Sequence, residues 1–185
     1  MEYLFHAVGL MWFASEVYLS KYLRSKSGDF QKDKHSLRYI WISVSIAVPV
    51  AVFSSKFISL PISSSAPFPF VGLAFILLGV LIRVLAIRKL GKFFTVNLAV
   101  DEQHTLVESG LYSLIRHPAY TGCLLSFVGL GLAFNNWISL AVLVLITSSA
   151  FLYRIYLEEK MLVGEMGEVY KRYQSRTKKI IPFIY

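Results

Sequence analysis

Long apolar runs alternate with short polar clusters along the chain. Most of the runs approach the roughly 20 residues that an α-helix needs to cross the hydrocarbon of a bilayer. The pattern predicts an all-α fold, an integral membrane helical bundle of about five transmembrane helices that forms a single domain over residues 1–185. The predicted spans are Tyr3–Tyr22, Tyr39–Ile62, Phe70–Ile87, Ala119–Phe134 and Trp137–Leu157.

The breaks between and within these runs carry their own predictions. Pro49 and Lys56 fall inside the second run, so we expect that helix to be kinked or made of two tilted pieces. A stretch rich in serine and proline, residues 63–69, ends it. Only Asn135 and Asn136 separate the last two runs, which predicts a tight helical hairpin.

Composition supports a membrane protein and excludes several other classes. Hydrophobic residues make up 56% of the chain, the mean hydropathy is +0.58, and only 16% of residues are charged. The net charge of +8 comes from residues that flank apolar runs, so membrane lipids are the expected partner and nucleic acid is not. One cysteine, Cys123, allows no internal disulfide, and the four histidines show no metal-ligand spacing. We therefore expect no metal site.

The basic residues predict the orientation of the spans. Six lie between Lys21 and Arg38, five between Arg83 and Arg116, and seven from Arg154 onward, which accounts for 18 of the 19. Only Lys56 falls on the opposite side. By the positive-inside rule, the N-terminus is expected outside, and the 88–116 segment and the C-terminal tail in the cytosol.

The stretch from Arg116 to Gly122, at the entry of the fourth span, is the first candidate for chemistry. Pro118 suits the first turn of a helix and His117 suits the cap position before it. The unpaired N–H groups of a helix start attract carboxylates and phosphates, so a cofactor could bind there. The alternative is an Arg-His anchor at the lipid headgroups.

Two further stretches are predicted on the same cytosolic face. Arg154 and Glu158 are four residues apart and share a helix face, which a simple salt bridge would explain. Glu159 points about 100° away from Glu158 on a helix, so the two acids need different partners, and such pairs suit ribose hydroxyls. The stretch from His104 to Tyr112 is either an ordered turn over the site or an interfacial loop.

Taken together, these stretches resemble the isoprenylcysteine carboxyl methyltransferase family of small membrane methyltransferases. The resemblance covers roughly residues 79–182. Its motifs are Leu90–Phe94, His104–Val107 with Gly110 and Tyr112, Arg116–Gly122, Arg154 with Glu158 and Glu159, Leu162, Gly167–Tyr170, Tyr173, and Ile181 with Pro182. Residues 1–70 carry no motif of the family, so the role of the N-terminal spans stays unassigned.

The resemblance implies S-adenosylmethionine as cofactor, in a cytosolic pocket formed by the 88–120 segment and the C-terminal helix and tail. It implies a lipophilic acceptor that enters from the bilayer, such as a prenylated cysteine, with Arg154 facing the acceptor carboxylate as the catalytic and substrate-binding residue. The implied cofactor-binding residues are His104, Thr105, Leu106, Val107, Tyr112, His117, Pro118, Ala119, Tyr120 and Glu158.

Three alternatives stay open at this point. A methyltransferase could act on a phospholipid amine or a phenol-like hydroxyl, which would require removal of a proton. Membrane sterol and isoprenoid reductases carry a related His-Pro-x-Tyr signal and use NADPH, but their usual tail motif is absent from this sequence. A non-enzymatic scaffold is the third, and the clustering of His117, Arg154 and Glu158 on one predicted face argues against it.

Overall fold

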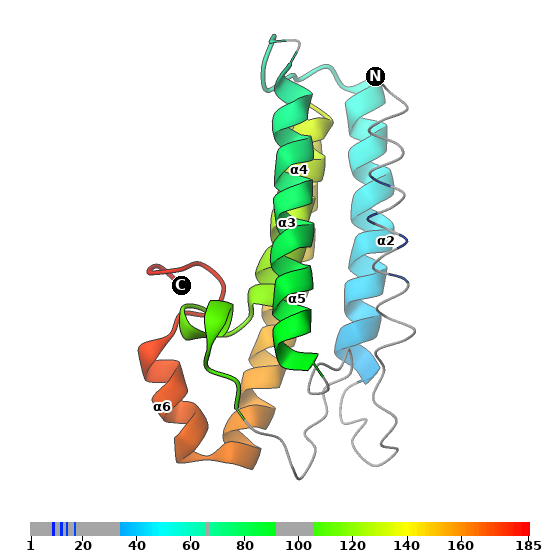
Figure 1. Ribbon diagram of the computed structural model, residues 1–185. Helices are drawn as coiled ribbons and strands as arrows, with labels where there is room; N and C mark the ends of the chain where they lie inside the picture. The colour runs from blue at the N-terminus through cyan, green and yellow to red at the C-terminus, as the bar shows by residue number, and fades with distance from the viewer. Residues whose placement is uncertain are drawn as a thin grey trace.

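The protein is a bundle of long helices with a smaller helical region gathered at one end (Figure 1). The computed structural model describes residues 34–65, 67–91 and 106–185, together with Gly9, Trp12, Ala14 and Val17. Its elements are α2 (Lys34–Phe57), α3 (Phe68–Leu90), the short 3₁₀ helix η3 (Gly110–Ser113), α4 (Pro118–Ala133), α5 (Trp137–Met166) and α6 (Glu168–Arg176).

The helices confirm the all-α membrane fold. In the described part of the chain, three helices are long and apolar enough to cross a membrane, namely α2 from His35, α3 and α5. The fourth predicted span appears as α4, which is apolar but shorter, at 16 residues. Most of the first predicted span, Tyr3–Tyr22, lies outside the described residues, although the four described positions within it are helical.

Two helices differ from their predicted extents. Helix α2 is one continuous helix through Pro49 rather than two pieces, and it ends at Phe57 rather than Ile62. Helix α5 continues to Met166, well past Glu158, because no residue breaks it before Gly167. Gly167 has a φ of 55°, in the left-handed region that favours glycine, and α6 starts at the next residue.

The Asn135-Asn136 turn forms the predicted hairpin and also fastens the neighbouring α2–α3 connection. Asn136 caps α5 by accepting a hydrogen bond from the Ser139 amide at 3.0 Å. Its side-chain amide donates to the Ile58 carbonyl at 2.7 Å, while Asn135 exchanges hydrogen bonds with the backbone of Ser63. The two connections at this end of the bundle therefore hold each other.

Glycines let α3 and α4 pack backbone against backbone. A Cβ atom added to Gly72 would lie 2.4 Å from the Gly129 carbonyl oxygen, and one added to Gly79 would lie 2.5 Å from that of Gly122. The two pairs are seven residues apart on each helix, so they line one antiparallel seam. Small residues at such positions let the backbones of two membrane helices approach closely.

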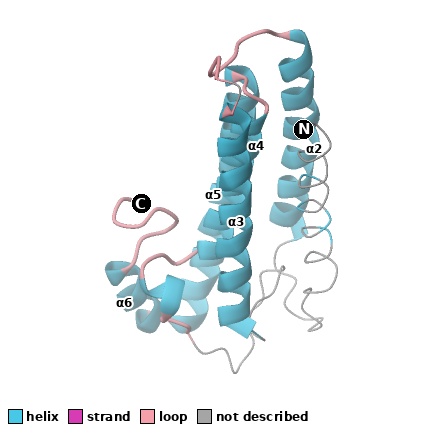
Figure 2. Cartoon of the chain, turned by 45° about the horizontal axis from the view of Figure 1, so that its top comes forward, coloured by secondary structure: helices cyan, strands magenta, loops and turns pink. Residues whose placement is uncertain are grey.

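The opposite end of the bundle collects the segments that carry the candidate motifs. Figures 1 and 2 show η3, α6 and the C-terminal segment beside the start of α4 and the lower half of α5. A small hydrophobic cluster joins Ala86 of α3, Tyr112 of η3 and Ala119 of α4, with Val107 and Leu111 packed against it. This cluster is separate from the main core, which includes Trp12, Phe127 and Leu143.

Candidate active site

The C-terminal segment pairs with the residues that lead into α4. The Arg116 amide donates to the Lys178 carbonyl at 2.8 Å, the His117 amide donates to the Lys179 carbonyl at 3.0 Å, and the Lys178 amide returns a bond to the Leu114 carbonyl at 3.1 Å. Because this parallel pairing fixes the backbone just before α4, it sets where the following side chains point. His117 caps α4 and Pro118 is its first residue, as predicted.

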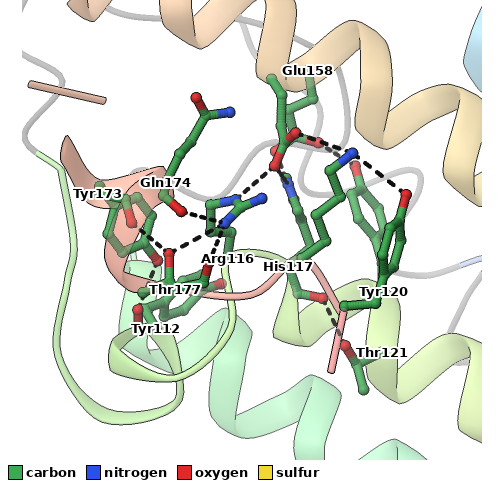
Figure 3. Close-up of polar contacts among 12 residues, drawn as sticks. Tyr112, Arg116, His117, Tyr120, Thr121, Glu158, Tyr173, Gln174 and Thr177 are labelled. Atoms are coloured by element: carbon green, nitrogen blue, oxygen red, sulfur yellow. Dashed lines mark hydrogen bonds and ion pairs between the residues drawn. The ribbon is translucent and has the colours of Figure 1, made fainter. Parts of the chain in front are cut away.

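Arg116 ties the C-terminal segment to α5. Its Nε donates to Oε1 of Glu159 at 2.7 Å, while its Nη1 donates to the Gln174 carbonyl at 3.1 Å and to the carbonyl of Thr177 (Figure 3). The side chains of Arg116 and Glu159 are only 7% and 10% exposed. This is a buried charge pair in which Nη1 of Arg116 also donates to backbone carbonyls, and such added hydrogen bonds offset part of the cost of burying charges.

The two adjacent acids share His117, whose Nδ1 lies 3.9 Å from Oε1 of Glu158, but their other partners differ, so the prediction from their helical spacing holds in part. Glu159 contacts Arg116 and Nε2 of His117 through Oε1, the latter at 3.3 Å, and Nζ of Lys179 lies 3.7 Å from its Oε2. Glu158 accepts a hydrogen bond from the Tyr120 hydroxyl at 2.7 Å and is 25% exposed. Glu159 is therefore engaged within the protein, while Glu158 is the acid that a ligand can reach.

The Tyr120 hydroxyl links Glu158 to Arg154. It accepts a hydrogen bond from Nε of Arg154 at 3.1 Å and donates one to Oε2 of Glu158. The sequence offered a direct salt bridge as the simple explanation for the spacing of Arg154 and Glu158, and the structure places a tyrosine hydroxyl between them. The Tyr120 ring also stacks on His117, with ring centroids 5.7 Å apart. Four of the predicted site residues therefore form one connected group.

Ser36 of α2 completes this group and was not anticipated from the sequence. Its Oγ accepts a hydrogen bond from Nη1 of Arg154 at 2.7 Å, although the two residues are 118 positions apart. Ser36 is fully buried and Arg154 is 1% exposed. No motif marks Ser36, which lies in a polar stretch just before an apolar run, so the sequence alone contained no signal for this contact.

The structure places Tyr112, Val107 and Ala119 in the small hydrophobic cluster. Tyr112 is 5% exposed, and its backbone carbonyl accepts a hydrogen bond from the Tyr173 hydroxyl at 2.7 Å. Burial raises the pKa of Tyr112 and of Tyr173 well above the ordinary value, so both phenols stay protonated. Leu106, which directly precedes Val107 in the chain, is half-buried. His104 and Thr105 lie outside the described residues.

Comparisons with known proteins converge on one family. Residues 70–164 match the isoprenylcysteine carboxyl methyltransferase (ICMT) family. A probable protein-S-isoprenylcysteine O-methyltransferase of Oryza sativa subsp. indica is 34% identical over 117 residues, which are 62% of this chain and 61% of the rice protein. Protein-S-isoprenylcysteine O-methyltransferase B of Arabidopsis thaliana is 35% identical over 115 residues, 61% of this chain and 58% of that protein.

A solved structure has the same fold. The eukaryotic intramembrane Ras methyltransferase ICMT, determined without a monobody, superposes with a TM-score of 0.73 at 28% sequence identity. The superposition covers 97% of this chain and 65% of that one. In the sequence comparisons, the chain matches about three fifths of the length of its two plant relatives. With its helical membrane fold and the family match over half its length, the chain belongs to the isoprenylcysteine carboxyl methyltransferase family.

Proposed function

We propose that this protein is a membrane-embedded methyltransferase that moves the methyl group of S-adenosylmethionine to the carboxylate of a lipophilic acceptor, such as a prenylated cysteine. The observation that carries the proposal is the group formed by Arg154, Tyr120 and Glu158. It combines a buried cation suited to an acceptor carboxylate with a reachable anion suited to a cofactor, only one tyrosine hydroxyl apart. The family of the chain supports the same reaction.

The side chains at this end of the bundle fit S-adenosylmethionine. That cofactor carries an ammonium group, a sulfonium and a ribose diol, all of which a carboxylate can hold by charge or by hydrogen bonds. Glu158 supplies a part-exposed carboxylate, and the His117 and Tyr120 rings lie beside it. Glu159 is not part of the proposed contact set, because Arg116, His117 and Lys179 already surround it.

The cofactor residues proposed here have different roles. His117, Tyr120 and Glu158 would contact the ligand with their side chains. Pro118 and Ala119 are buried, so they would shape the pocket through the first turn of α4. Val107 and Tyr112 would support its wall through the small hydrophobic cluster, and Leu106, next to Val107 in the chain, would extend that wall. His104 and Thr105 complete the proposed set.

The proposed methyl transfer requires alignment of the two reactants and exclusion of water, and it requires no general base. When bound, the cofactor supplies an electrophilic methyl group on a positively charged sulfur. A carboxylate is already ionised at neutral pH, so its oxygen forms the new C–O bond without loss of a proton. The C–S bond would break and leave its electron pair on sulfur, which would become a neutral thioether. Opposite charges cancel in this step, so removing water from the two reactants favours it.

Arg154 would orient the acceptor in this scheme. Its guanidinium is planar and holds carboxylates through paired hydrogen bonds, which fixes the attacking oxygen in line with the methyl group. Its position, 1% exposed and next to apolar helices, keeps water from the reacting oxygen. A lipophilic acceptor would enter from the bilayer, and the cofactor would enter from the aqueous phase.

We also propose that the N-terminus is outside and the site and C-terminus are cytosolic, as the distribution of basic residues indicates.

The experiment that tests the proposal combines binding and turnover. Purified protein in detergent is titrated with S-adenosylmethionine and, separately, with NADPH. Transfer of a radiolabelled methyl group is then measured with N-acetylated farnesylcysteine and with phosphatidylethanolamine as acceptors. We expect binding of S-adenosylmethionine and methylation of the farnesylcysteine. Binding of NADPH alone would indicate a reductase, methylation of the amine alone would reassign the acceptor, and binding of neither ligand would leave a scaffold.

Glu158→Ala tests the cofactor assignment within the same assay. We expect it to weaken S-adenosylmethionine binding by about 1–3 kcal/mol, the usual cost of losing a hydrogen-bond partner in a dry site. Glu165→Ala, which removes an exposed acid seven residues further along α5, is the matched control and should bind normally. Equal affinity of Glu158→Ala and wild type would reduce Glu158 to a structural partner of Tyr120 and His117.

A further inference from the structure

Arg154 is held on two sides by side chains from two other helices. Tyr120 of α4 contacts its Nε at 3.1 Å, and Ser36 of α2 contacts its Nη1 at 2.7 Å. All five N–H donors of a guanidinium lie in one plane, so two bonds in different directions fix both the position and the tilt of that plane. A reaction that depends on alignment with a methyl–sulfur bond depends on this tilt.

The bond to Ser36 is the shorter and the more buried of the two. At 2.7 Å it has the short length of a hydrogen bond from a charged donor. Ser36 is fully buried, so no water is at hand to replace its oxygen if the hydroxyl is removed. The neighbouring contact between α2 and α5, in which the rings of Tyr39 and Tyr153 pack edge to face at 6.0 Å, holds the two helices together at this level.

We infer that Ser36 is a positioning residue for the reaction, acting through Arg154. The inference rests on the proposed function, since it assumes that Arg154 orients the acceptor. It extends that function to helix α2, which lies outside the 70–164 segment that matches the family. Part of the N-terminal region, to which the sequence assigned no role, thereby becomes part of the active site.

A directional chain of hydrogen bonds supports the inference. Arg154 donates to both Ser36 and Tyr120, and Tyr120 in turn donates to Glu158. The acceptor-side cation and the cofactor-side anion therefore share one connected set of bonds anchored on α2. Loss of the Ser36 oxygen would remove one of the bonds that orient the guanidinium, so its plane could tilt while the bond from Tyr120 to Glu158 stays in place.

The test compares Ser36→Ala with Ser54→Ala, which removes another buried hydroxyl from the far end of the same helix. We expect Ser36→Ala to lower kcat for the farnesylcysteine acceptor by on the order of 10- to 100-fold, with S-adenosylmethionine affinity within about 2-fold of wild type. Ser36→Thr, which keeps a hydroxyl oxygen, should recover much of the loss, and Ser54→Ala should turn over normally. In an Arg154→Lys background, Ser36→Ala should cause little further loss, because both changes remove the same alignment.

A second readout does not depend on turnover. The ¹⁵N Nε–H resonance of Arg154, assigned by its loss in Arg154→Lys, should shift or broaden in Ser36→Ala and stay unchanged in Ser54→Ala. An unchanged resonance together with wild-type turnover in Ser36→Ala overturns the inference, as does an equal loss of turnover in Ser54→Ala. If wild type binds S-adenosylmethionine yet methylates no carboxylate acceptor, the proposed function fails. The resonance then decides whether Ser36 positions Arg154 at all.

Discussion

The glycine seam between α3 and α4 leads to a quantitative prediction for stability. In Gly72→Ala, the new Cβ would lie 2.3 Å from the Ala133 nitrogen and 2.4 Å from the Gly129 carbonyl oxygen. Real Cβ atoms do not approach backbone atoms this closely, so the helices must move apart. Backbone atoms of two packed helices cannot rotate away as a flexible side chain could. The strain therefore spreads along the seam.

The expected magnitude is the difference of two effects. Overpacking a well-packed core costs about 1–3 kcal/mol, and contacts with backbone on both sides place this change at the upper end. Alanine is favoured over glycine inside a helix by about 1 kcal/mol, which offsets part of the cost. We expect a net loss of about 1–2 kcal/mol in the free energy of unfolding, and a melting temperature lower by about 2–8 °C.

The assay uses the one cysteine of the chain. Cys123 is 3% exposed, so a thiol-reactive fluorophore labels it only as the bundle opens, and its fluorescence reports unfolding in detergent. Gly164→Ala in α5 is the matched control, because a Cβ there meets no atom within 4 Å. The control should melt at or above the wild-type temperature. If Gly72→Ala melts as high as Gly164→Ala, the close approach of α3 and α4 does not limit the stability of the bundle.

Three further predictions concern the site and the topology. Arg154→Lys should keep S-adenosylmethionine binding and lose turnover by on the order of 10- to 100-fold, since a point charge cannot replace the planar fork, and near-normal turnover in the radiolabel assay would refute the carboxylate clamp. Arg116→Met should destabilise the protein by about 3–5 kcal/mol in the thiol assay, because it leaves Glu159 buried without its closest cation. The double change with Glu159→Leu should cost less than Arg116→Met, and a larger cost would contradict the pairing. A tag at the N-terminus should be accessible from outside and a tag after Tyr185 from the cytosol, as impermeant labelling of intact cells can establish.

The sequence alone determined the features that depend on local patterns. Apolar run length predicted the membrane helices, because the hydrocarbon thickness sets the length of each span independently of its neighbours. The cap at His117 and the helix start at Pro118 follow from backbone chemistry within one turn. The hydrogen bond of Glu158 to Tyr120 and the ion pair of Glu159 with Arg116 follow from the helical angle between adjacent residues, although His117 contacts both acids.

Only the tertiary structure decided which distant side chains meet. Arg116 reaches Glu159 across 43 positions and Arg154 reaches Ser36 across 118, and neither distance leaves a periodic trace in the sequence. Whether Arg154 and Glu158 bond directly or through Tyr120 depends on how α4 lies against α5, not on their spacing along α5. A hydrogen bond needs two groups at about 3 Å with the right orientation, and for residues far apart in the chain, helix packing alone supplies both conditions.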